Sequence, residues 1–499
     1  MTIRALVRER PLQPASARRT EWLRRGLERD GLAISVLAFW TIILALAMPI
    51  LLNQDSWLAF VDGRLVAQHG LPHIDTLTIW TLGRHWIDQQ WAAHLVLYEA
   101  VAHGGLGAAI LIGIGCVAGA LGLAAYAARR LGASSGSVAL GVSLPVLATP
   151  WLAEVRSQSF ALIPFVVLYA LLASDSRAPS RRVLFVLPLL AVWANFHGSV
   201  SLGAALAALY GLSRFRSRTA RARGLVLFVG APLCVLASPY GLGLIPYYRL
   251  MLLHPPLARY VAEWQPPGFK GSTIIFFVSA IAAAGLWIVA RRALTTFERW
   301  AIPLLLAASF VAVRNGVWFE LAAVVSLPRL VDALWPSRIE QTPQVRRVNT
   351  ILASVAVLAV VSVLAVQLGR APGWLDGSRS PAAAAAVARA AGSDGIVLAD
   401  DEHADWLLWL QPSLTGRIAY DVRFELFDGR ELQQLKLLET ASRPVWRRCG
   451  AAARVVTFAG PTAARAAQRV LVRGSRTIVR GKTFVAVAQP SAGREPCRL

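Results

Sequence analysis

Long apolar stretches constrain this chain more than any other feature of its sequence. We place about eleven stretches of roughly 20 mostly apolar residues, the length that a helix needs to cross the hydrocarbon core of a bilayer. Their centres lie near residues 42, 116, 142, 165, 190, 206, 231, 281, 306, 325 and 358. The composition agrees, because 56% of the 499 residues are hydrophobic and 16% are charged. The sequence therefore predicts a polytopic α-helical membrane protein with a transmembrane domain over residues 32–368.

Arginine clusters between these stretches predict the topology. The net charge is +23, but the arginines do not line one soluble face, so we expect no nucleic-acid partner. A basic segment, residues 1–31, precedes the first stretch and is too long and too polar for a cleaved signal peptide. Every second loop is basic, at residues 129–130, 177–182, 214–223, 291–292 and 346–347. Because basic loops stay in the cytoplasm, we expect a cytoplasmic N-terminus and, after an odd number of spans, an extracytoplasmic C-terminus.

Residues 369–499 have the mixed composition of a soluble protein, and we expect them to form a small extracytoplasmic α/β domain. Helical patterns occur at residues 381–392, 431–441 and 462–472. Strand patterns occur at residues 395–400, 418–424 and 453–458, and residues 477–487 predict a hairpin. Cys449 and Cys497 either pair or remain two unrelated thiols, because sequence spacing alone does not show proximity.

The segment of residues 53–90 is too polar to cross a membrane and is predicted to be an outward loop. It is rich in tryptophan, with Trp57, Trp80, Trp86 and Trp91. The headgroup region of a bilayer favours such amphipathic rings. We therefore expect this loop to lie along the membrane surface.

Polar residues that a bilayer disfavours gather at the outward ends of the predicted spans. All eight histidines also fall in outward loops, at outward span ends or in the C-terminal domain. Asp55 ends the first span, where it is suited either to accept a proton as a general base or to cap a helix. Arg156 and Arg314 are suited to phosphate through their fork of donors, but pairing with Glu154, Glu263 or Asp55 also explains them.

A metal site has weaker support. His69, His73 and His197, together with aspartates of the first loop, have suitable ligand chemistry. Pro72 interrupts the helical spacing of the first two histidines, and the loop holds no HExxH motif or close Asp-x-Asp pair. We assign no metal ligand and expect no cofactor, and the motifs leave divalent-metal dependence open.

Short motifs follow one another in a fixed order along most of the chain. They are QDSW (54–57), DGRLVAQHGLPHIDTLT (62–78), GRHWIDQQW (83–91), RSQSF (156–160), WANFHGSVSLG (193–203), SPYG (238–241), AEWQPP (262–267), VRNGVWF (313–319) and AYDVRFELF (419–427). In this order they resemble a family of bacterial multi-pass membrane proteins grouped with the GT-C glycosyltransferases. The first outward loop of that family pairs an early Asp-x-Trp with a later Gly-x-Pro-x-x-Asp. The family often has a histidine shortly after Asp-x-Trp, where this chain has Ala59.

The resemblance implies a GT-C fold in the bacterial inner membrane and a sugar donor linked to polyprenyl phosphate. It implies transfer of the sugar, with inversion, to an extracytoplasmic acceptor that is a glycan, a lipid or a protein. Asp55 is implied as the catalytic base. The residues expected to contact the substrate are Asp75, Arg156, His197, Glu263 and Arg314.

Two other functions compete with this hypothesis: a transporter or flippase without chemistry, and a non-catalytic protein of envelope assembly. A transporter is expected to have polar or broken segments near the bilayer midplane, often in paired repeats, and neither is clear in the sequence. The glycosyltransferase hypothesis requires Asp55 to face a cavity that also contains Arg156 and Arg314.

Overall fold

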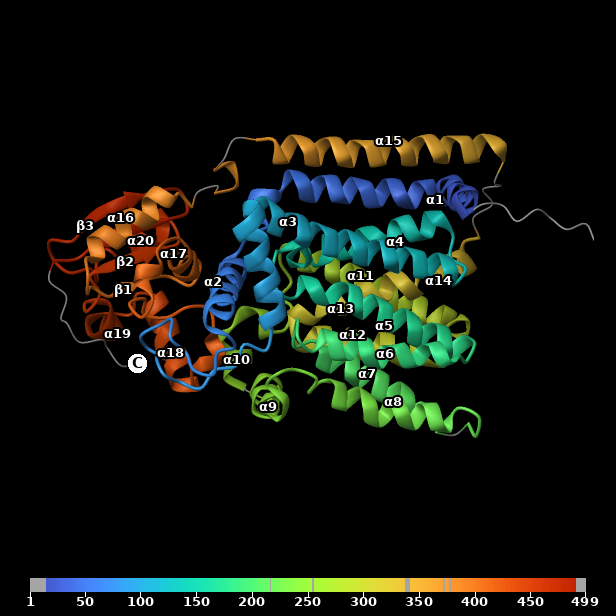
Figure 1. Ribbon diagram of the computed structural model, residues 1–499, viewed down its shortest axis with the longest axis horizontal. Coiled ribbons are helices and arrows are strands. Elements are labelled where there is room, and N and C mark those ends of the chain that lie inside the picture. Colours follow the sequence, from blue (N-terminus) through green and yellow to red (C-terminus); the bar gives the residue numbers. More distant parts are fainter. Residues whose placement is uncertain are drawn as a thin grey trace, which may run out of the picture.

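The computed structural model describes residues 15–490 apart from 216, 254, 337–341, 371–372 and 377–378. Two parts lie end to end along the long axis of the molecule (Figure 1). One is a bundle of roughly parallel helices, here called the helix bundle. The other, residues 381–490, combines helices with a sheet and is called the C-terminal region. The possible pairing of Cys449 with Cys497 lies outside the described residues, because residue 497 is not among them.

The helix bundle contains a helix at each predicted span. These helices are α1 (Ala15–Leu46), α3 (Trp91–Arg130), α4 (Ser135–Ala148), α5 (Ser159–Arg177), α6 (Val186–Trp193), α7 (Val200–Ser213), α8 (Arg221–Cys234), α11 (Thr273–Ala290), α12 (Thr296–Val311), α13 (Gly316–Ser326), which α14 (Pro328–Leu334) follows, and α15 (Pro343–Leu368). Among the described residues, five helices are long and apolar enough to cross a membrane, namely Gly26–Leu46, Trp91–Arg130, Ser159–Arg177, Thr273–Ala293 and Pro343–Leu368. A multi-pass helical membrane protein is confirmed, and the count of about eleven spans stays a prediction.

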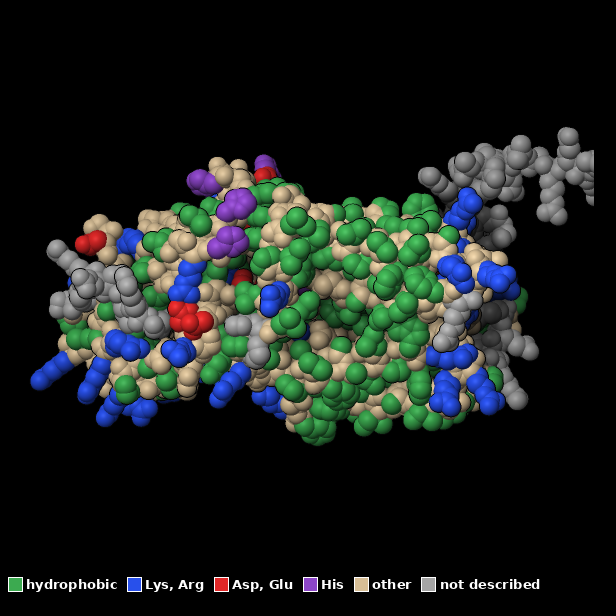
Figure 2. All heavy atoms as spheres, turned by 90° about the horizontal axis from the view of Figure 1, so that it is seen from below, with side chains coloured by type: hydrophobic (Ala, Val, Ile, Leu, Met, Phe, Trp, Pro, Cys, Tyr) green, Lys and Arg blue, Asp and Glu red, His purple; other side chains and the backbone are tan. Residues whose placement is uncertain are grey.

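The position of each helix in the bundle follows from its apolar surface. Every residue of α13 is buried, as expected for a helix that is apolar on nearly all sides, and its polar residues Glu320 and Ser326 form hydrogen bonds inside the bundle. By contrast, α15 packs mainly against α1 and leaves Val355, Leu358 and Val361 exposed. A side chain at Gly31 would overlap the backbone of Asn349, so the glycine allows α1 and α15 to approach closely. The outer surface of the bundle is largely apolar (Figure 2), as lipid contact requires.

The predicted basic loops meet at one end of the bundle. Figure 2 shows Lys and Arg side chains gathered at the end away from the C-terminal region. There Arg129 pairs with Asp30 of α1, and Arg177 Nη1 donates to the carbonyl oxygen of Leu131 at 3.2 Å. The loops after α3 and α5 therefore lie at the same end as the beginning of α1, which agrees with the predicted alternation. Which end faces the cytoplasm stays a prediction.

The C-terminal region contains a four-stranded sheet with strand order β1-β2-β4-β3. The strands are β1 (Val397–Leu398), β2 (Val455–Phe458), β3 (Arg476–Arg480) and β4 (Val485–Ala488), with β1 parallel to β2 and the other pairs antiparallel. Its helices are α16 (Pro381–Ala391), α17 (Ala404–Leu410), α18 (Gly429–Glu439), α19 (Arg443–Val445) and α20 (Pro461–Ala467). The predicted hairpin forms β3 and β4. The predicted strand at 418–424 is wrong, because only Ile418 forms bridges before the chain turns at Asp421.

Residues 53–90 join the two parts of the molecule, and their position relative to a membrane surface stays a prediction. The segment begins with α2 (Gln54–His69), whose N-terminus is closed by a capping box between Asn53 and Ser56. Its later backbone bonds to the C-terminal region, for example Trp80 N to the carbonyl oxygen of Ala419 at 3.1 Å. The expected headgroup position is wrong for Trp57 and Trp86, which are 3% and 5% exposed inside the protein.

Gly63 sets the distance between α2 and α3. A Cβ at this position would overlap the carbonyl oxygen of His94 and lie 2.5 Å from the Cβ of Tyr98. We therefore expect Gly63→Ala to force the helices apart and to destabilise the protein by about 1–3 kcal/mol, measured as a lower unfolding temperature in detergent. Gly115→Ala is the control, because no atom lies within 4 Å of an added Cβ there. Equal unfolding temperatures for the two variants would contradict this account of the helix contact.

Candidate active site

A pocket of about 710 Å³ lies where the helix bundle meets the C-terminal region. Its walls come from the start of α2, the loop before α5, the loop between α6 and α7, and α9 (Leu244–Leu253) with α10 (Pro255–Tyr260). Residues 422–425 and α18 of the C-terminal region close the remaining side. Segments that are hundreds of residues apart in the sequence therefore share one cavity.

Arg156 is the centre of charge in this pocket. Its Nη1 donates to Asp55 Oδ2 at 2.9 Å and to Glu263 Oε1 at 2.8 Å, and Glu154 Oε2 lies 3.6 Å away. The side chain is held deep in the protein, with the residue only 4% exposed. No described residue accepts a hydrogen bond from its buried Nε and Nη2. One guanidinium thus holds three carboxylates and keeps two donor nitrogens unused.

The backbone fixes Asp55 and Arg156 beside each other. Asp55 lies in the first turn of α2, directly after the capping box. Ser56 Oγ donates to the carbonyl oxygen of Val155 at 2.5 Å, and Val155 N donates to the carbonyl oxygen of Leu51 at 2.9 Å. The start of α2 and the loop that carries Arg156 are therefore clamped together before any substrate is present.

The carboxylates around Arg156 differ in acidity. Burial raises the pKa of Glu154 to about 7, although the charge of Arg156 acts to lower it. Burial also acts to raise the pKa of Glu263, but the charges of Arg156 and Arg314 outweigh it and lower the value. Glu263 therefore stays ionised and holds the guanidinium, whereas Glu154 takes up a proton near neutral pH.

Arg314 is a cation without a close carboxylate. Its guanidinium carbon lies 4.6 Å from the ring centre of Trp264, which supports it by a cation–π contact. No described carboxylate lies within 4.0 Å of this guanidinium. Burial lowers its pKa, and Arg156 adds to this effect, so an anion arriving beside Arg314 would remove an electrostatic cost.

His197 is neutral and lies in the same pocket. Burial and the charges of Arg314 and Arg156 hold the pKa of His197 well below its usual value. Ser199 N donates to His197 Nδ1 at 3.1 Å, so Nδ1 carries no proton and Nε2–H remains as a donor. Tyr248, whose buried hydroxyl has no partner among the described residues, lines the pocket nearby.

Five of the six residues expected at the site line this pocket, namely Asp55, Arg156, His197, Glu263 and Arg314. Asp75 does not line it, and its contacts lie within the protein. Its carboxylate is fully buried and accepts from Arg423 Nη2 at 2.7 Å, from Thr78 Oγ1 at 3.0 Å and from Thr81 Oγ1 at 2.6 Å. With both oxygens engaged, Asp75 holds the C-terminal region to the 53–90 segment.

Several pocket residues were not predicted from the sequence. His94 of α3 lines the pocket, and so do Arg423 and Glu425 of the C-terminal region. Burial raises the pKa of Glu425 to about 7. The motif AYDVRFELF contains the last two residues, but nothing in it shows that they face the first loop. The sequence signal for His94 was that all eight histidines fall in outward loops, at the outward ends of predicted spans or in the C-terminal domain.

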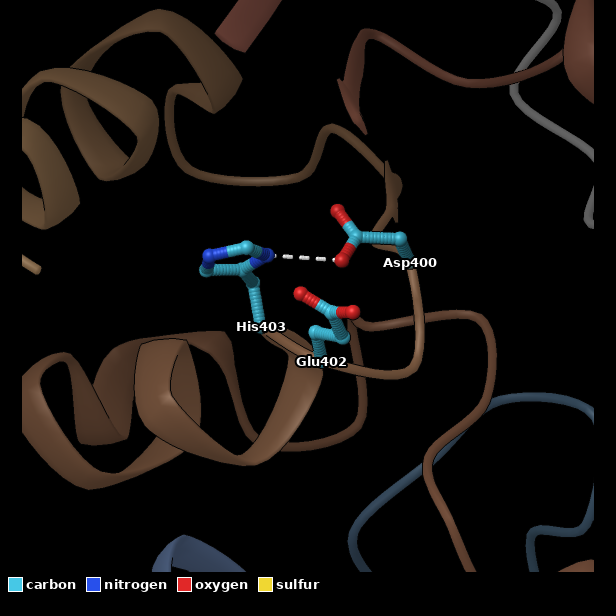
Figure 3. Close-up of side chains that lie close together, drawn as sticks. All are labelled: Asp400, Glu402 and His403. Carbon is cyan, nitrogen blue, oxygen red and sulfur yellow. Dashed lines mark hydrogen bonds and ion pairs between the residues drawn. The ribbon is translucent and has the colours of Figure 1, made fainter. Parts of the chain in front are cut away.

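Asp400, Glu402 and His403, at the start of α17, have the ligand chemistry of a metal site (Figure 3). One possible ligand atom from each lies within 4.8 Å of the others. Both oxygens of Asp400 are already engaged, with His403 Nδ1 at 2.6 Å and with Thr457 Oγ1 at 2.6 Å. Glu402 is exposed, so these hydrogen bonds account for the arrangement as a brace between α17 and β2.

Comparison with solved structures decides the fold. The crystal structure of ArnT from Cupriavidus metallidurans bound to undecaprenyl phosphate superposes with a TM-score of 0.50 at 14% sequence identity, covering 91% of this chain and 98% of that one. The chain has the GT-C fold of ArnT. The apo structure of the same ArnT is 14% identical over the same shares of each chain, with a TM-score of 0.48. No protein-family model and no curated protein sequence matches the chain. The fold expected from the motif order is thereby confirmed, and ArnT carries no residue assignment to this chain.

Proposed function

We propose that the protein is an integral membrane glycosyltransferase that moves a sugar from a polyprenyl-phosphate-linked donor to an extracytoplasmic glycan, lipid or protein. The observation that carries this proposal is the common pocket of Asp55, Arg156 and Arg314. It lies at the end of the bundle opposite the basic loops, where the topology prediction places the outer face of the inner membrane. The fold shared with ArnT, whose crystal structure holds undecaprenyl phosphate, supports the donor class.

The donor phosphate binds between Arg314 and His197. Arg314 supplies a guanidinium that forms no ion pair within 4.0 Å with a described carboxylate, and neutral His197 supplies its Nε2–H. Arg156 lines the same pocket and adds positive charge near this position. The polyprenyl tail then follows the apolar outer surface of the bundle.

Asp55 acts as the base of the transfer. Its Oδ2 is held by Arg156, and the side chain is 34% exposed to the pocket, so a hydroxyl group can reach it. When the acceptor oxygen attacks the anomeric carbon, its proton passes to Asp55 and the phosphate leaves with the electron pair of the broken bond. Attack from the face opposite the phosphate inverts the anomeric carbon.

The C-terminal region forms the acceptor side of the pocket. Asp401, Glu425 and Lys436 line this wall, and α18 packs against α10. These polar groups are suited to form hydrogen bonds with the hydroxyl groups of an acceptor. Burial raises the pKa of Asp401 to about 6, so this carboxyl group also donates a hydrogen bond in its protonated form at acidic pH.

Binding of undecaprenyl phosphate tests the proposal without knowledge of the sugar. We expect Arg314→Gln to weaken binding by about 10- to 100-fold, because one charge-assisted hydrogen bond contributes roughly 1.5–3 kcal/mol. The measurement is a titration of the full chain in nanodiscs with undecaprenyl phosphate.

Arg291→Gln is the matched control for this titration. Arg291 also lies over a tryptophan, with its guanidinium carbon 5.5 Å from the ring centre of Trp287, but it does not line the pocket. Wild-type affinity in Arg291→Gln and a large loss in Arg314→Gln are expected. Equal affinity in both variants would remove Arg314 as the phosphate contact and with it the main support for the proposal.

A further inference from the structure

His94 is bound by two buried carboxylates behind the wall of the pocket. It lies in the first turns of α3, and its Nδ1 is 3.0 Å from Asp88 Oδ2 and 3.7 Å from Asp62 Oδ2. Asp88 and Asp62 are 2% and 0% exposed, so water screens neither carboxyl group. Asp88 is fixed in turn, because its Oδ1 accepts from Gln90 N at 3.0 Å. The imidazole therefore has a fixed orientation.

The other ring nitrogen of His94 has no hydrogen-bond partner among the described residues, and the residue lines the pocket. His94 lines the pocket together with Gln54, Asp55 and Leu58 of α2. Nδ1 is committed to Asp88, and the structure shows no hydrogen bond from a described residue to Nε2. In acid–base catalysis, a histidine accepts a proton on one ring nitrogen while a carboxylate orients the ring through the other nitrogen.

The packing of side chains around His94 does not by itself explain why two carboxyl groups lie beside the ring. Asp62 has no hydrogen-bond partner for either oxygen among the described residues, although it is completely buried. Burial raises the pKa of Asp62 well above its usual value, so Asp62 tends to keep a proton and to stay uncharged. Asp88, whose Oδ2 lies 3.0 Å from His94 Nδ1, is therefore the carboxylate that stabilises an imidazolium in a pocket that already contains the proposed base.

We infer that His94 is a proton relay for Asp55, with Asp88 orienting the ring and stabilising its protonated form. This inference rests on the proposed function. As the sugar bond forms, the acceptor O–H bond breaks and its proton goes to Asp55. The proton then passes through water in the pocket to His94 Nε2, and from His94⁺ to bulk water when the products leave. Asp55 is returned to its basic form, and no further reactant is needed.

The titratable and charged groups that face His94 determine how the relay depends on pH. They are Asp55 and Asp62 on α2, Asp88 before α3, and His197 from the loop before α7; Arg423 of the C-terminal region faces Asp62. The relay works only while His94 is neutral before transfer, so activity rises with pH as His94 loses its proton. Asp88 stabilises the protonated form, so without its charge this rise moves to lower pH.

The experiment is a pH profile of sugar transfer by the full chain in nanodiscs. The donors are radiolabelled hexoses and pentoses linked to undecaprenyl phosphate, and the acceptor is a cell-envelope fraction. We expect His94→Gln to lower kcat by about 10- to 100-fold, to leave the KM for donor within about twofold, and to lose the acid limb of the profile. Asp88→Asn is expected to fold normally and to move that limb to lower pH.

His403→Gln is the matched control. His403 also binds a carboxylate through Nδ1, at 2.6 Å from Asp400 Oδ1, but it does not line the pocket (Figure 3). We expect it to keep the wild-type rate and profile. A His94→Gln variant with wild-type kinetics, or one with a lower rate and an unchanged acid limb, would overturn the relay and leave the glycosyltransferase proposal standing. A wild-type chain that transfers no sugar would overturn both.

Discussion

Asp55→Asn is expected to abolish sugar transfer while the protein still folds and inserts. Asparagine keeps the size of the side chain and an oxygen that accepts from Arg156 Nη1, now 2.9 Å from Asp55 Oδ2, but it does not take up a proton. Loss of a general base lowers the rate by roughly 10²- to 10⁴-fold. The measurement is transfer from undecaprenyl-phosphate-linked sugars to an envelope fraction, with undecaprenyl phosphate binding determined in parallel.

Glu99→Gln is the control for Asp55→Asn. Glu99 is also a carboxylate near the outward end of the bundle, but it pairs with exposed His103 at 3.2 Å and lies outside the pocket. Its loss is expected to leave transfer unchanged. Undiminished transfer by Asp55→Asn would remove this residue as the base, even if lipid binding is normal.

Arg423→Met is expected to detach the C-terminal region from the helix bundle. Arg423 is 2% exposed, and its Nη2 donates to Asp75 Oδ1 at 2.7 Å while its Nε donates to Asp421 Oδ2 at 2.9 Å. Without the guanidinium, two buried carboxylates keep their charge and lose their partner. Such a loss destabilises a protein by roughly 3–5 kcal/mol. Hydrogen exchange at residues 75–86 and 416–425 measures the loss directly.

The surroundings of Arg423 explain why its charge is not shared more widely. Burial raises the pKa of Asp62 and of Asp405 well above the usual range, so both take up protons more readily than a solvated aspartate. Asp75 and Asp421 are therefore the carboxylates that pair with Arg423. Asp75→Asn combined with Arg423→Met is expected to recover part of the stability, because it removes one of the orphaned charges.

Arg84→Met is the control for Arg423→Met in the hydrogen-exchange measurement. Arg84 joins the same two parts through Glu431 at 2.5 Å, but its side chain is 38% exposed. An exposed pair of this kind contributes about 0–1 kcal/mol. Equal exchange in Arg84→Met and Arg423→Met would show that the buried pair does not hold the two parts together.

The sequence predicted the bundle well because apolar stretches and arginine clusters are local signals. Each predicted span centre falls in a helix, and the loops with Arg129 and Arg177 do meet at one end. Asp55, Arg156 and Arg314 were also found from local position, since each is a charged residue at the outward end of a span.

The errors concern contacts between distant segments. Asp75 has the local pattern of a loop carboxylate, and only its bond to a guanidinium 348 residues later shows its structural role. The 418–424 segment has the composition of a strand, but buried Asp421 and Arg423 turn it toward the first loop. His94 was missed because its partner, Asp88, lies six residues earlier, in the loop before α3. A separation of six residues does not place two side chains next to each other on a helix, so the sequence gives no sign of this pair.

The wall of the pocket that the C-terminal region forms is the last part of the pocket to be synthesised. Residues 422–439 close the side opposite Asp55, Arg156 and Arg314, and they follow the whole helix bundle in the chain. A chain emerging from the ribosome therefore inserts its base and both arginines while the pocket is still open to water. With the predicted topology, the pocket is complete only after the C-terminal region has crossed the membrane and docked on residues 53–90. A protein with that topology is expected to have no finished pocket on the cytoplasmic side of the membrane at any stage of its synthesis.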